Sequence, residues 1–190
     1  CRRYTAACAA FGDAGEVDNT VNTGLGFVRA AGNDAIGILA QSVGGAGGVG
    51  ATNITGLITA SSTSSGGVGI GLGGFGGGGG DGKLVINHVT GGVVMTGREN
   101  SNAILAQCVG GSGGAGGMNV TGSVNLSNSG GGGIVGFGLG GFGGGGGNAG
   151  AVESIVTTAD ASQYFMTSGE NSTAIIAQST GGAGGVGALN

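Results

Sequence analysis

The side chains that could perform catalysis are few and widely separated. The chain has one histidine, His88, and nine acidic residues that do not cluster. General acid–base catalysis needs a titratable group held beside a partner, and no second histidine or aligned acid accompanies His88. Sequences of the form GxGxxG are plentiful, but no βαβ pattern surrounds them. The sequence therefore predicts no enzyme, no catalytic residue and no cofactor.

One stretch superficially resembles a calcium-binding nonapeptide. In GGGGGDGKL the aspartate is Asp81, but the apolar position of the nonapeptide is occupied by Lys83. The equivalent of Asp81 in the other copy of this stretch is Asn148. Because such nonapeptides bind calcium only in tandem, and this one does not recur in tandem, we expect no metal site.

The three cysteines do not form an obvious redox site. Cys108 occupies the position that Ser42 and Ser179 hold in related segments, so we expect a small, sheltered side chain with a free thiol. Cys1 and Cys8 would pair with each other or with another chain, and the sequence leaves this open.

Composition excludes several classes of protein. The chain has 54 glycines in 190 residues, no proline, 39% hydrophobic residues and a net charge of -4, which excludes a disordered chain and collagen. The five Lys and Arg residues are scattered and predict no nucleic-acid partner. No apolar run is long enough to span a membrane. The first ten residues lack a signal peptide's apolar core, so we expect a piece of a longer protein.

Similar segments recur along the chain: GILAQSVGGAGGVG (37–50), AILAQCVGGSGGAGG (103–117) and AIIAQSTGGAGGVG (174–187). This spacing predicts one continuous repeat domain made of a partial cassette, 1–53, and two complete cassettes, 54–119 and 120–190. Three sets of equivalent residues are candidates for structural ladders, in which like side chains stack on one another: Gln41, Gln107 and Gln178; Asn53, Asn119 and Asn190; Ile38, Ile104 and Ile175.

Each cassette contains short runs typical of β-strands. These are KLVINHVT (83–90), AILAQCV (103–109), NVTGSVNLS (119–127) and ESIVTT (153–158), whereas glycine disfavours helix by about 1 kcal/mol per residue. One cassette cannot bury its apolar face alone, so we expect an all-β solenoid of stacked copies. A cassette would divide into three coils of about 22 residues each.

The glycine tracts place their other residues three apart, as at Leu72 and Phe75 and again at Leu139 and Phe142. Period three is typical of a polyproline II helix, whose bare glycine edges allow close packing. The alternative is a flexible linker. We expect ordered packing, with these four side chains substantially buried.

The three Gln-containing segments resemble the GxxSxGIxAQS[IV]GGGGG repeats in the passenger regions of large Gram-negative autotransporters. This resemblance covers about a third of the chain, which departs from the pattern at Cys108 and Thr180. It implies a secreted, cell-surface, right-handed parallel β-helix that is exported through a separate barrel.

We therefore expect an extracellular structural or adhesive region, a stalk or adhesin that contacts a host cell, a neighbouring cell or matrix. The alternative is a self-assembling extracellular filament or matrix protein. No capping unit is evident at either end of the repeat pattern, so its ends would be covered by further cassettes or by chains stacked head to tail.

Overall fold

The computed structural model describes residues 12–62, 66–128, 132–158, 162 and 164–188, and within these ranges the chain is all-β with no helix. Eleven strands account for the regular structure of the described residues, and β7 has the bounds expected from the sequence. The strands are β1 (Val17–Ala30), β2 (Ile36–Val43), β3 (Asn53–Ser61), β4 (Gly67–Leu72), β5 (Val85–Thr96), β6 (Asn102–Val109), β7 (Asn119–Ser127), β8 (Ile134–Leu139), β9 (Val152–Thr157), β10 (Phe165–Thr167) and β11 (Ile175–Thr180).

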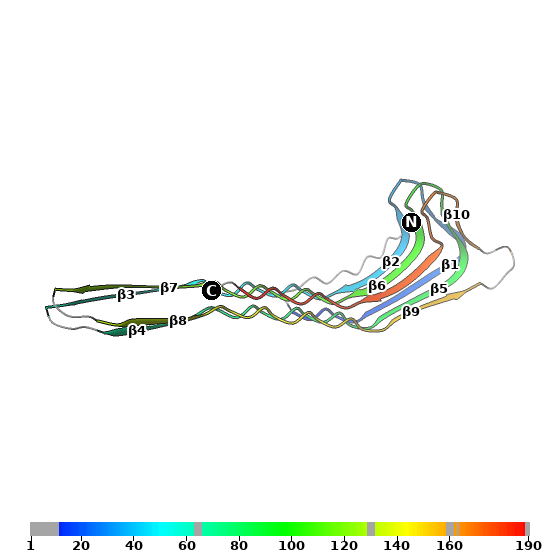
Figure 1. Cartoon of the computed structure of the whole chain (residues 1–190). Helices are drawn as coiled ribbons and strands as arrows, with labels where there is room; N and C mark the ends of the chain where they lie inside the picture. The colour runs from blue at the N-terminus through cyan, green and yellow to red at the C-terminus, as the bar shows by residue number, and fades with distance from the viewer. Residues whose placement is uncertain (1–11, 63–65, 129–131, 159–161, 163, 189–190) are drawn as a thin grey trace. The chain divides into compact units, whose positions relative to one another are not determined.

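All strand pairs are parallel, and each joins equivalent residues of successive cassettes. Ile38 pairs with Ile104, which pairs with Ile175 on its other side. Paired residues are therefore 66 to 71 positions apart, a whole cassette. Figure 1 shows β2 and β6 side by side. The expected division into three coils of 22 residues is wrong, because that arrangement would pair residues about 22 positions apart.

The chain divides into two compact units, and each cassette contributes to both. Unit 1 comprises 1–45, 80–111 and 147–182, and unit 2 comprises 46–79, 112–146 and 183–190. The units therefore cut across the cassette boundaries.

Unit 1 contains two parallel sheets with an apolar core between them. One sheet has the order β1-β5-β10, with β9 also paired to β5, and the other has the order β11-β6-β2. Both Val85 and Ile104 are fully buried. Short turns connect the sheets, and at each turn an Asp or Asn adopts a φ of 52°, a left-handed conformation that these residues tolerate better than most; they are Asp34, Asn100 and Asn171.

Unit 2 contains two two-stranded sheets, β3-β7 and β4-β8, which Figure 1 labels. The sheets face each other mainly through glycine and polar residues, together with Leu57. A Cβ atom added to Gly71 would meet the amide group of Asn119, and one added to Gly67 would lie 2.5 Å from Leu57 Cδ2. Alternate glycines in β4 therefore allow the two sheets to approach closely.

The glycine tracts of unit 2 form five ordered segments, here called rods: 46–51, 73–79, 112–118, 140–146 and 183–188. Their backbone hydrogen bonds repeat every three residues. Gly47 donates to Ser112, and Gly50 donates to Ala115, at 2.7 and 2.8 Å. A second edge bonds each rod to the preceding one, as where Gly114 donates to Gly77 at 2.8 Å. These bonds supply the partners that a polyproline II helix lacks internally.

The third edge of each rod carries the side chains and faces outward. Leu72, Phe75, Leu139 and Phe142 are 51 to 62% exposed, so the expectation that they are buried is wrong. In the rods 73–79 and 112–118, two of every three positions have α-carbons that face neighbouring backbones and must be glycine, which leaves only the outer edge for side chains. The rods are nevertheless bonded along their length and are not flexible linkers.

Candidate functional site: stacked polar ladders

The three glutamines of the repeat lie side by side and form a ladder. The amide nitrogen of Gln41 donates to the Oε1 atom of Gln107 at 2.9 Å, and that of Gln107 donates to Gln178 at 3.2 Å. Each glutamine occupies the same position in its sheet, in β2, β6 or β11. The ladder therefore satisfies the amide groups between cassettes.

The isoleucine set is only partly buried. Ile38 and Ile104 are buried in the core of unit 1, whereas Ile175 is 42% exposed. The three residues are in register in their sheet, as expected of a ladder, but the third is not buried. Both β2 and β11 are end strands of this sheet, but Ile38 packs with Ile104 in the buried core cluster of unit 1, which does not include Ile175.

The asparagine set forms a second ladder in unit 2. Asn53 Nδ2 donates to Asn119 Oδ1 at 3.1 Å. Asn119 is buried and also donates to the carbonyl oxygen of Gly71 at 3.1 Å, which ties the two sheets of the unit together. Asn190, the third member of the set, lies outside the described residues.

A third ladder was not anticipated from the sequence. Asn19 donates to the fully buried Asn87 at 2.7 Å, and Asn87 donates to Ser154 at 3.4 Å. Because Ser154 replaces an asparagine, an alignment based on identical residues does not reveal this set. The position within the strand could have revealed it, since Asn19, Asn87 and Ser154 are each the third residue of their strand.

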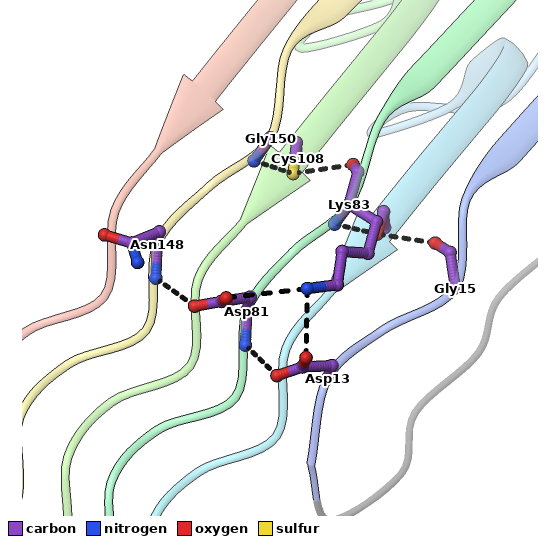
Figure 2. A network of polar contacts seen from close by, with 8 residues as sticks. Asp13, Gly15, Asp81, Lys83, Cys108, Asn148 and Gly150 are labelled. Atoms are coloured by element: carbon purple, nitrogen blue, oxygen red, sulfur yellow. Dashed lines mark hydrogen bonds and ion pairs between the residues drawn. The ribbon is translucent and has the colours of Figure 1, made fainter.

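Hydroxyl and thiol groups connect the two sheets of unit 1, and Figure 2 shows the thiol of Cys108 between Lys83 and Gly150. Ser42 Oγ donates to the carbonyl oxygen of Gly15 at 2.9 Å and accepts from the amide of Lys83 at 3.0 Å. One cassette further on, Cys108 Sγ donates to the carbonyl oxygen of Lys83 at 3.1 Å and accepts from the amide of Gly150 at 3.0 Å. Each group thus joins two successive cassettes of the opposite sheet.

Cys108 is fully buried and is a free thiol. Its bonds match those of Ser42, and Ser179 donates to Gly150 at 2.8 Å in the same manner. The small residue expected at this position therefore has a hydrogen-bonding role as well as a size limit. Cys1 and Cys8 lie outside the described residues.

The acidic stretch at Asp81 is part of another ladder (Figure 2). The backbone amide of Asp81 donates to Asp13 Oδ1 at 2.9 Å, and the amide of Asn148 donates to Asp81 Oδ1 at 2.7 Å. Lys83 Nζ lies 2.9 Å from Asp13 Oδ2 and 3.5 Å from Asp81 Oδ2. The ammonium group therefore bridges two stacked carboxylates.

These contacts shift the ionisation of two groups. The hydrogen bond from the Asp81 backbone, aided by Lys83, lowers the pKa of Asp13. The hydrogen bond with Asp13 raises the pKa of Lys83. Both groups are exposed to solvent, so the pair orders a turn at the surface and is not a buried reactive centre.

The described part of the chain contains no group of three His, Cys, Asp or Glu side chains placed to hold a metal ion. His88 lies in β5 between Thr20 and Ile155 of the neighbouring strands. Within the same residues, every buried side-chain nitrogen and oxygen has a hydrogen-bond partner. The polar groups of this site therefore bond mainly to one another and to the backbone.

In the described residues, no helix has the length and apolar character needed to cross a bilayer.

No family model, curated protein or solved structure significantly matches the chain.

Proposed function

We propose that this chain is a structural and adhesive repeat region displayed on the outside of a cell. In this proposal each cassette makes one coil of a parallel β-solenoid, and the glycine rods are the part of each coil that runs between its strands. The resemblance to autotransporter passenger repeats implies a right-handed coil. The proposal assigns no catalytic role to any residue.

The observation that carries the proposal is the register between cassettes. The same register holds in both units, as shown by the pairing of Gln41 with Gln107 and of Asn53 with Asn119. Each cassette therefore presents the hydrogen-bonding groups with which the next cassette pairs. Such a repeat extends by adding copies, which suits a spacer or an extended binding surface. The low charge of the surface and its exposed apolar side chains suit adhesion.

Immunogold labelling of intact source cells tests the location. Antibodies against the purified chain should label the outer surface before permeabilisation. Labelling that requires permeabilised cells would contradict the proposal. A permeabilised sample and a cytoplasmic marker serve as controls for access.

Electron microscopy of the purified chain tests the alternative of a filament. A stalk or adhesin gives discrete particles, whereas fibres of constant width whose axial repeat matches a few cassettes would favour a self-assembling filament.

A further inference from the structure

Unit 2 has an inverted distribution of side chains. In β4 the glycines face the partner sheet, whereas Val68, Ile70 and Leu72 alternate with them and face outward. Glycine and polar positions, with Leu57, therefore fill the space between the sheets, and most apolar side chains of unit 2 remain on the surface. This arrangement is the reverse of an ordinary half-buried sheet.

The outward residues of β4, β8 and the adjoining rods form a continuous surface, which we call the apolar strip. It consists of pairs of equivalent side chains from successive cassettes, each 48 to 73% exposed: Val68 with Val135, Ile70 with Phe137, Leu72 with Leu139, and Phe75 with Phe142. The rings of Phe75 and Phe142 stack with their centroids 5.6 Å apart. The strip is thus a row of ordered ladders.

The size of the strip matches that of a protein interface. Its eight side chains together expose on the order of 800 Å², which exceeds the patch of a few hundred Å² usual on a soluble monomer. A standard interface buries about 800 Å² on each partner. The strip is therefore large enough to support a specific contact by itself.

Charge narrows the choice of occupant. The segments of unit 2 contain no Asp, Glu, Lys, Arg or His, and they also lack Trp and Tyr. Surfaces that bind at a membrane interface usually use basic residues and interfacial aromatics. A charged partner would find no complementary group. A second copy of the strip is equally uncharged and apolar, so it matches without burying an unpaired charge.

We propose that the apolar strip binds the same strip of a second copy of this chain. The net charge of -4 resides entirely outside unit 2, so contact between two strips does not bring like charges into the interface. A contact between identical surfaces is two-fold symmetric and closes after two copies. The product is a dimer that joins two chains side by side. The inference concerns the isolated chain, so it stands or falls separately from the surface location.

Sedimentation velocity of the whole chain in a reducing buffer, across a wide range of concentrations, tests this inference. The unaltered chain should dimerise reversibly. The variant Ile70→Thr/Phe137→Thr keeps strand-forming residues at both positions and should raise the dimer Kd at least about tenfold. The control Ile54→Thr/Val120→Thr alters outward residues of the β3-β7 sheet and should leave the Kd unchanged.

A chain that is monomeric at every concentration would overturn the proposal, and so would an equal effect of the control variant. If Ile70→Thr/Phe137→Thr loses its β circular dichroism, the milder Val68→Thr/Val135→Thr takes its place and should also weaken the dimer. Flotation with phosphatidylcholine vesicles distinguishes the lipid alternative. Vesicle binding by a monomeric chain that the strip variant abolishes would assign the strip to lipid and overturn the proposal.

Discussion

The thiol of Cys108 lies 3.1 Å from the carbonyl oxygen of Lys83. It performs the function that Ser42 performs one cassette earlier, because both groups donate to a carbonyl and accept an amide proton across the two sheets. A sulfur atom is the weaker donor and acceptor of the two.

Cys108→Ser should therefore fold with unchanged or higher stability, by up to about 1 kcal/mol. Cys108→Val keeps a side chain of similar size but leaves the carbonyl of Lys83 and the amide of Gly150 without this partner. It should lower the free energy of unfolding by about 1–3 kcal/mol. Urea denaturation in reducing buffer measures both, and equal stability of the Val and Ser variants would contradict the bridging role.

Gln107 bonds on both sides, whereas Gln178 only accepts a bond from Gln107 within the ladder. Replacing Gln107 with Leu should cost about 1–2 kcal/mol, because it removes two hydrogen bonds. The matched variant Gln178→Leu removes one and should cost about half as much. Thermal or urea denaturation measures both losses of stability. If the amides bonded only to water, Gln107→Leu would cost no more than Gln178→Leu.

Glycine tolerance should differ sharply between positions of the same rods. A Cβ atom on Gly114 would collide with the carbonyl group of Gly48, whereas one on Gly48 meets nothing within 4 Å. Gly114→Ala should thus destabilise the chain by several kcal/mol or prevent folding. Gly48→Ala should be neutral or stabilise by about 0.4–1 kcal/mol, since it restricts the unfolded chain. Similar effects of the two variants would contradict the bonded rods.

The Asp13–Lys83 pair should make stability depend on pH. The pKa of Asp13 is lowered in the fold, so its contribution to stability is fully present above about pH 3.8 and is lost as the pH falls through the folded pKa. The pKa of Lys83 is raised, so its contribution to stability is fully present below about pH 10.5 and is lost as the pH rises through the folded pKa. The difference in Tm between the unaltered chain and Lys83→Met should shrink at both extremes.

Lys83→Arg, which keeps the cation, is the control for the Lys83→Met comparison. A difference in Tm that is constant from acid to alkaline pH would show that Lys83 acts through packing alone.

The repeat pattern predicted the strands and the alignment between cassettes, because side chains that stack must recur at one spacing. It did not predict that equivalent strands of successive cassettes pair directly with each other, since periodicity fixes which residues are equivalent but not which strands are neighbours. The period of three correctly predicted that side chains occupy one edge of each rod and glycines the other two. It did not predict which edge faces inward. Phe75 faces outward because the glycine edges pack against the backbones of neighbouring segments.

The polar ladders were partly predictable for the same reason. Gln41 and Gln107 are identical and align without ambiguity, whereas Asn87 and Ser154 differ in type and share only a strand position. The bond between Ser42 and Gly15 joins segments of different sequence, so no comparison of repeats could have revealed it.

The proposal that one cassette makes one coil is tested most directly by a cross-linking experiment. Ile54→Cys/Val120→Cys, in a background with Cys1, Cys8 and Cys108 changed to Ser, places two thiols on paired positions of β3 and β7. Neighbouring strands are about 4.8 Å apart, within the range of a disulfide. The control Ile54→Cys/Val124→Cys displaces one thiol by four residues, about 13 Å along the strand. We expect an intramolecular disulfide in the first variant and little in the control. Three coils per cassette would separate residues 54 and 120 by about 14 Å, so failure of the paired variant to cross-link while folded would contradict the account.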